Sequence, residues 1–215
     1  YHPAMSGHGE GTCEHDHDCS DAECGNLWTL YKSVDTHKVT CLNEREDGSC
    51  QKVFKAWHDR LSTDDVLESN EDDGELLLHV PFTSDVKIKS ICVIGGAGGT
   101  GPAKLRVWVN RTDIDFAAAA DSEAVQEWDL GENSHGHLEY ATKAAKFQGV
   151  GSLTMYFPES LAGEDESTRI HFIGFKGEAT GNRRDGVTTF VYEALPQPGD
   201  HKRAEDSLGA GHMMH

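Results

Sequence analysis

A glycine-rich stretch between two alternating segments constrains the fold of this chain more than any other feature. Residues 96–101 read Gly-Ala-Gly-Gly-Thr-Gly, which has the spacing of a dinucleotide-binding loop. Such a loop holds a pyrophosphate only where a helix begins at its last glycine, because the phosphates lie against the first helical amides. Here Pro102 follows, and residues 104–110 alternate polar and apolar side chains as a half-buried strand does. No Gly-Lys-Ser or Gly-Lys-Thr sequence occurs either, which excludes a P-loop. The pattern predicts a strand–loop–strand connection in an all-β domain.

Short alternating segments recur from residue 76 onward, separated by glycine, asparagine, aspartate, proline or acidic clusters. The predicted strands are residues 76–82, 86–94, 104–110, 126–130, 137–142, 150–157, 168–176 and 187–194. Pro81 suits the end or the edge of the first of these strands. Residues 39–42 predict a brief strand, residues 53–61 a loop or short helix, and the alanines at 117–120 are too few for a helix that stands alone. This spacing, without a convincing amphipathic helix, predicts an antiparallel β-sandwich or jelly roll.

The two ends of the chain differ in composition from its middle. Residues 1–25 are acidic, contain no lysine or arginine and have little apolar surface, and residues 196–215 are polar. Segments of this kind cannot bury enough apolar surface to fold, so we expect both tails to be disordered. A single domain over residues 26–195 is predicted between them.

Charge and composition exclude several classes of function. The formal net charge is −18, and such a field repels phosphate backbones and anionic membrane surfaces. No apolar run is long enough for a transmembrane helix, and the first residues lack the basic and apolar regions of a signal peptide. We therefore expect neither nucleic acid nor a membrane as a partner, a cytoplasmic and also nuclear location, and cysteines in the thiol form.

Several short motifs follow one another in an informative order. They are Cys41-Leu42-Asn43-Glu44, Val53-Phe54-Lys55-Ala56-Trp57, the acidic run from Glu68 to Leu77, Val80-Pro81-Phe82-Thr83, residues 86–91, residues 146–150, residues 173–178, and Tyr192-Glu193-Ala194. In this order they resemble the PITH domain family, the proteasome-interacting thioredoxin C-terminal domain, over residues 26–201. No thioredoxin domain precedes them in the sequence given, so we expect the stand-alone form of the family.

The resemblance implies a jelly roll similar to galactose-binding domains, and it implies attachment to the regulatory particle of the proteasome. No Cys-x-x-Cys sequence is present, so the thiol chemistry of a thioredoxin is not implied. We expect a non-enzymatic intracellular adaptor without a cofactor, monomeric outside that complex. Two alternatives stay open. One is a metal- or ligand-binding module that uses the histidine-rich tails or the loop rim, where related sandwiches bind glycans, and the other is a scaffold subunit of another assembly, such as a cytoskeletal one.

Histidines and cysteines in both tails are candidate metal ligands. The N-terminal candidates are Cys13, His15, His17 and Cys19, whose imidazole and thiolate groups suit zinc or copper. Their spacing matches no structural zinc site, so a solvated tail is the alternative. Near the other end, His212 and His215 flank two methionines and are candidates to ligate an open metal position on a partner, with disorder as the alternative.

Aromatic residues beside polar loops are the candidate partner contacts. Trp57 and Phe116 are expected to reach the surface and anchor a partner, because buried aromatic side chains dominate interface energies. Gly98 and Gly99 lie in the loop of the opening motif and are candidates to contact the same partner. Cys92 lies in an apolar strand and is predicted to be a small core residue.

Hydrolase chemistry has no support in the sequence. No Gly-x-Ser-x-Gly elbow occurs, and His79 and His171 are single histidines within predicted strands. The acidic run at residues 71–73 adjoins a glycine and is expected to be a solvated turn, which offers no desolvation to raise the pKa of a general acid.

Overall fold

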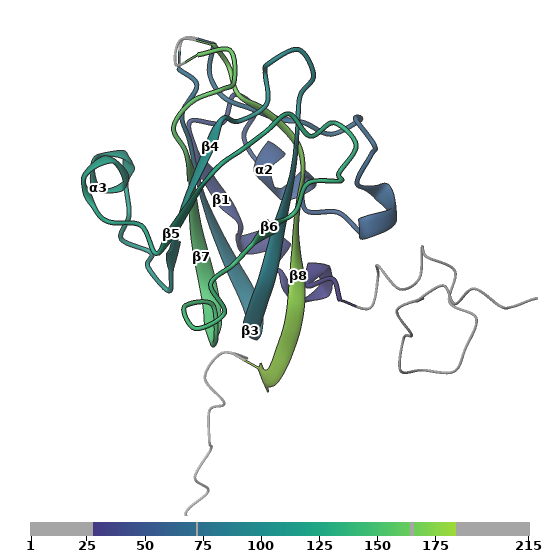
Figure 1. Ribbon diagram of the computed structural model, residues 1–215, viewed down its shortest axis with the longest axis vertical. Helices are drawn as coiled ribbons and strands as arrows, with labels where there is room; N and C mark the ends of the chain where they lie inside the picture. Colours follow the sequence, from purple (N-terminus) through teal and green to yellow (C-terminus); the bar gives the residue numbers. More distant parts are fainter. Residues whose placement is uncertain (1–27, 72, 164–165, 184–215) are drawn as a thin grey trace, which may run out of the picture. The chain divides into compact units, whose positions relative to one another are not determined.

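The computed structural model describes residues 28–71, 73–163 and 166–183, and it confirms the all-β prediction (Figure 1). The strands are β1 (Thr40–Leu42), β2 (Leu67–Glu68), β3 (Leu76–Gly95), β4 (Lys104–Val109), β5 (Gln126–Asp129), β6 (Tyr140–Ala141), β7 (Val150–Phe157) and β8 (Arg169–Arg183). The helical elements are η1 (Tyr31–Ser33), η2 (Thr36–Lys38), α2 (Ser49–Lys52), η3 (Trp57–Asp59) and α3 (Phe116–Asp121). All the strand pairings of this part of the chain are antiparallel, in the order β2-β8-β3-β7-β4-β5, with β1 and β6 also paired to β3.

The long strand β3 connects the two halves of the fold. Its first half, Leu76–Pro81, pairs with β1 and β7, whereas the residues from Val86 to Gly95 pair mainly with β8 and β6. The register shifts between Pro81 and Val86, which is where the strand changes neighbours. A strand that passes from one set of partners to another forms a corner between two sheet regions.

The main core lies on one face of these strands, and two smaller apolar clusters lie outside it. Along β8 the alternation is visible, since Ile173 and Phe175 belong to the main core while Phe172 belongs to a separate cluster with Cys92 and Ile94. The other cluster packs α3 against β3, β4 and β7 and contains Leu77, Trp108, Ile114, Ala119 and Tyr156. Every residue of β7 is buried because this strand contributes to the main core and to the α3 cluster.

Most strand predictions are confirmed, the expectation that Pro81 ends a strand was wrong, and the tetra-alanine is helical only with support from outside the helix. Pro81 does not end a strand but lies inside β3, where it adjoins the register shift and its carbonyl accepts from the Asp35 amide at 2.9 Å. A proline has no N–H to donate to a neighbouring strand, so it is tolerated inside a strand only where the pairing is irregular, as it is between Pro81 and Val86. The tetra-alanine forms the short helix α3, whose first turn is capped by the Asp115 carboxylate at 2.7 Å from the Ala118 amide. Its last carbonyls accept from the Arg106 guanidinium.

Several sequence-based expectations fall beyond the residues that the structure describes. They are the strand at residues 187–194, the two tails, and the candidate ligands Cys13, His15, His17, Cys19, His212 and His215. The predicted strand at residues 137–142 shortens to the two residues of β6. None of the helices in the described part of the chain has the length and apolar character that crossing a bilayer requires.

Candidate protein-interaction surface

The glycine-rich loop joins β3 to β4, as the sequence predicts, and its backbone is hydrogen-bonded to β8. Gly98 and Gly99 have φ angles of +69° and +86°, a region that side chains other than glycine rarely occupy. The Arg169 amide donates to the Thr100 carbonyl at 2.7 Å, and the Gly96 amide donates to the Arg169 carbonyl at 2.9 Å. No helix begins after the loop, so its amides form no phosphate-binding helix terminus.

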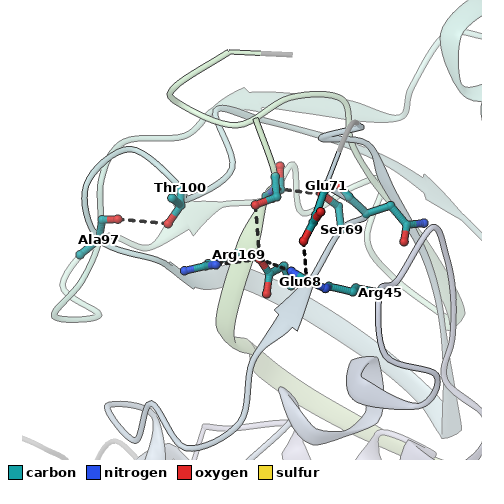
Figure 2. A network of polar contacts seen from close by, with 10 residues as sticks. Arg45, Glu68, Ser69, Glu71, Ala97, Thr100 and Arg169 are labelled. Carbon is teal, nitrogen blue, oxygen red and sulfur yellow. Dashed lines mark hydrogen bonds and ion pairs between the residues drawn. The ribbon is translucent and has the colours of Figure 1, made fainter. Parts of the chain in front are cut away.

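A polar network beside this loop centres on the Glu68 carboxylate of β2 (Figure 2). Arg169 approaches one Glu68 oxygen with Nε at 2.9 Å and Nη2 at 2.8 Å, and Arg45 lies 3.5 Å from the same oxygen. Arg45 also pairs with Glu71 at 2.6 Å. These contacts connect residues 68–71 to Arg169 of β8 and to Arg45. Because the Glu68 and Glu71 carboxylates are paired with arginines of the same domain, the network has a structural role.

The rim beside the loop offers little room for a small molecule. A recess lined by residues of the glycine-rich loop, by Leu130, Glu132 and Asn133, and by Leu161 holds about 10 Å³. That volume corresponds to about one water molecule. A sugar ring does not fit into it, so this recess does not support the ligand-binding alternative.

Trp57 lies on the outer face of the β3–β8 region and is partly buried. Its ring meets Phe172 edge-on at a centroid distance of 5.9 Å and thereby covers the small cluster with Cys92 and Ile94. Two cations lie against the same ring, since Lys176 Nζ is 4.3 Å and the Arg60 guanidinium carbon is 4.7 Å from its centroid. Cations in this position are attracted by the negative face of the indole.

Trp28 lies farther along β8 and has the same arrangement. Its carbonyl accepts from the Gly177 amide at 2.8 Å, which places the Trp28 backbone beside β8. The side chain is 51% exposed, and Lys89 Nζ lies 4.7 Å from the ring centroid. Lys89 also pairs with Glu178 at 2.5 Å, and this hydrogen bond lowers the pKa of the Glu178 carboxyl. We call Trp28, Trp57, Arg60, Lys89 and Lys176 together the aromatic–cation surface.

The indole groups of this surface differ from the other tryptophans of the fold. Trp108 Nε1 donates to the Glu123 carbonyl and Trp128 Nε1 to the Ala141 carbonyl, both at 3.1 Å. Trp28 and Trp57 have no such acceptor among the described residues. A partly exposed indole with an available N–H is well suited to bind a protein partner, because it offers a large apolar face and one directional donor.

The residues that the sequence nominated for partner binding do not form one site. Gly98 lies against the loop after β5, where Glu132 accepts from its amide at 3.4 Å, and Gly99 lies nearest to Ala162. Phe116 belongs to the α3 cluster and packs edge-on against Tyr156 at 6.2 Å. The structure therefore separates Phe116 from the aromatic–cation surface.

Sequence reasoning missed Trp28, Arg60, Lys89 and Lys176. Lys89 lies where the β3–β8 register shifts between Ile88 and Ser90, so its neighbours do not follow from alternation alone. The sequence signal that could have indicated this surface is the presence of lysines within two predicted strands and of two tryptophans outside any predicted strand.

His79, within β3, does not activate the Thr154 hydroxyl beside it. His79 Nδ1 lies 3.3 Å from the Thr154 hydroxyl, but that hydroxyl donates its proton to the Arg111 carbonyl at 2.6 Å. The ring nitrogen is therefore not the acceptor of the threonine proton. Burial lowers the pKa of His79, which favours the neutral ring. Across the described residues, no three His, Cys, Asp or Glu side chains come together in a group that could hold a metal ion.

The two buried thiols, Cys50 and Cys92, are predicted to be unreactive in the folded protein. Burial, with the nearby charge of Glu44 added, raises the pKa of Cys50 to about 12, and burial raises that of Cys92 to about 11. Because only the thiolate is nucleophilic, alkylation of both should be more than about a hundredfold slower than that of an ordinary thiol at mildly alkaline pH. Iodoacetamide labelling followed by peptide mapping measures this, with protein unfolded in guanidinium chloride as the control. Rapid labelling of native Cys50 would contradict the prediction.

Comparisons with known proteins agree with this architecture. A family model described as the PITH domain matches residues 20–196. A PITH domain-containing protein 1 from Dictyostelium discoideum is 40% identical over 192 residues, covering 86% of this chain and 93% of that protein. The protein of the same name from Homo sapiens is 33% identical over 201 residues, covering 94% and 93%. These names refer to no catalytic activity.

The solved structures that resemble this chain share its fold at low sequence identity. One contains the CBM32-1 and CBM32-2 domains of Clostridium perfringens ZmpB in complex with GalNAc, with a TM-score of 0.54 and 13% identity. It covers 74% of this chain and 39% of that one. The similarity supports the all-β sandwich fold that the strand pattern predicts.

Proposed function

This chain belongs to the PITH domain family, and from that premise we propose that it is a non-enzymatic adaptor that binds the regulatory particle of the proteasome. The adaptor acts inside the cell, in the cytoplasm and the nucleus. It contributes a binding surface to the assembly and carries out no chemistry itself.

The observation that carries the proposal is the aromatic–cation surface. Trp28 and Trp57 present partly exposed rings, and each ring has a lysine within 5 Å of its centroid. Both lysines are held beside the rings by ion pairs, Lys89 with Glu178 and Lys176 with Glu139, so the surface presents ordered indole groups flanked by paired charges. Interfaces are enriched in tryptophan and arginine, and their central aromatic residues account for most of the binding energy.

Replacing Trp28 and Trp57 together by alanine is expected to weaken binding to the regulatory particle by at least about 30-fold, because a truncated hot-spot tryptophan costs about 2 kcal/mol or more. The measurement is equilibrium binding of the full chain to purified regulatory particle by surface plasmon resonance. Trp28→Ala alone is the informative single variant, since this side chain is the more exposed of the two.

Leu42→Ala is the matched control, because Leu42 is 48% exposed and lies in β1, outside the aromatic–cation surface. Phe116→Ala separates the two aromatic candidates. Unchanged affinity in the double tryptophan variant, with wild-type binding intact, would exclude the aromatic–cation surface as the contact. Affinity purification that recovers another assembly and no proteasome subunit would exclude the function itself.

A further inference from the structure

A polar groove lies next to Trp57 and has no assigned role. It holds about 360 Å³ and opens between η1, α2 and the segment that runs through η3. Its volume falls at the lower end of the range of about 300 to 1,000 Å³ that is usual for ligand sites. The lining residues are Tyr31, Lys52, Phe54, Lys55, Ala56, Asp59, Ser62 and Asp65.

The unusual residue in this groove is Lys55. Its side chain is only 10% exposed, although removing an ammonium group from water is costly unless its donors are satisfied. Nζ donates to the Ser62 carbonyl at 3.0 Å, and the nearest carboxylate oxygen, that of Asp65, is 3.7 Å away. An ammonium has three N–H donors. Within the described residues only one of them has an acceptor at hydrogen-bond distance, so the groove contains a nearly buried cation with unused donors.

The other charges of the groove restrict what this cation can bind. The lining contains Lys52 and Lys55 together with Asp59 and Asp65, so the formal charges of the lining sum to zero. A dianionic phosphate would bring two negative charges beside the two aspartates, whereas a carboxylate brings one and is repelled less. A single carboxylate can displace the distant Asp65 contact and form a charge-assisted hydrogen bond with Nζ.

We propose that Lys55 binds a glutamate or aspartate side chain of a partner segment that lies in this groove beside Trp57. Naming a protein segment as the bearer of the carboxylate rests on the proposed function. The partner segment then combines an acidic side chain on Lys55 with contacts to the aromatic–cation surface, and Ala56 is the only residue between the two sites in the sequence.

The site is tested on the full chain with the peptide acetyl-Ala-Glu-Ala-amide as the probe and acetyl-Ala-Gln-Ala-amide as its neutral match. Titration followed by amide chemical shifts should show saturable changes within residues 52–65 for the glutamate peptide, with about tenfold weaker binding of the glutamine peptide. Lys55→Gln should remove this difference, and Lys55→Arg should retain it. Lys38→Gln is the control, since the Lys38 side chain is 76% exposed and its ion pair with Asp35 lies outside the groove.

A second variant is expected to increase the affinity for the glutamate peptide. Asp65→Asn removes the carboxylate that competes for Lys55, so the glutamate peptide should bind about threefold more tightly. A purely structural role of Lys55 would not produce tighter binding in this variant. Equal binding of the two peptides, or the absence of saturable shifts, would overturn the site.

Binding to the regulatory particle then distinguishes the site from the proposed function. Weaker particle binding by Lys55→Gln supports the assignment of the carboxylate to that partner. Unchanged particle binding by this variant would overturn that assignment while the adaptor function stands. If the wild-type chain does not bind the particle, the proposed function fails, and the peptide titration still decides the site.

Discussion

Gly177→Ala is expected to destabilise the domain by about 3 kcal/mol or more, which is the upper range for overpacking. A Cβ atom at this position would lie 1.9 Å from the Lys87 carbonyl oxygen and 3.1 Å from Ile88 Cα. Both neighbours are backbone atoms of β3, so no side chain can rotate to make room. The strands β3 and β8 would have to separate, or their register would have to change.

Urea unfolding of the purified protein measures this effect as a shift of the transition midpoint. The same variant should disturb the aromatic–cation surface, because the Gly177 amide donates to the Trp28 carbonyl at 2.8 Å. Weaker partner binding in this variant is therefore expected even where it is folded.

Gly98→Ala is the matched control for this prediction. Its Cβ would meet nothing within 4 Å, so the only cost is the positive φ angle of +69°. That cost is about 1 kcal/mol. If Gly98→Ala were as damaging as Gly177→Ala, the glycine-rich loop and not the β3–β8 contact would limit stability.

Strands were predictable where the sequence of one segment alone shows the apolar pattern of a strand. Residues 150–157 were predicted as a strand and form β7 with those bounds, because a short apolar run between turn residues has few alternatives. Helix α3 was not predictable from propensity, since its six residues depend on the Asp115 cap and on Arg106 from β4. The prediction that Pro81 ends a strand was wrong for a related reason. Whether a proline ends a strand depends on a register shift that only the neighbouring strands define.

The candidate site was predictable in part. Trp57 was identified from its polar neighbours, whereas Trp28, Lys89 and Lys176 come together only through the pairing of β3 with β8. The pairs Ile88–Gly177 and Ser90–Lys176 leave Lys89 in the register shift between them. Such a bulge changes where a side chain points, and no period of the sequence reveals it. Lys55 is a similar case, because its burial depends on Ser62 and Asp65 from a later loop.

Phe175→Ala is expected to destabilise the domain by about 3 to 5 kcal/mol, the usual cost of deleting a buried phenylalanine ring. Phe175 is 2% exposed, stacks on Phe54 at 6.1 Å and meets Phe82 edge-on at 5.6 Å. The three rings come from β8, from the segment after α2 and from β3, so one deletion leaves a cavity where distant parts of the chain meet. Thermal unfolding should show a decrease in Tm of about 10 °C.

The control for this deletion is Phe116→Ala, which removes the same ring from a half-buried position with one aromatic neighbour, Tyr156. It should cost clearly less, because solvent already reaches the site and the cavity is smaller. Phe175→Ala has a further consequence for binding, since the Phe175 carbonyl accepts from the Leu30 amide at 2.8 Å and thereby helps to place the segment with Trp28. Equal destabilisation by the two variants would mean that the α3 cluster matters as much as the main core. Partner binding lost in Phe175→Ala, at a temperature where it is folded, would indicate that the core positions the aromatic–cation surface.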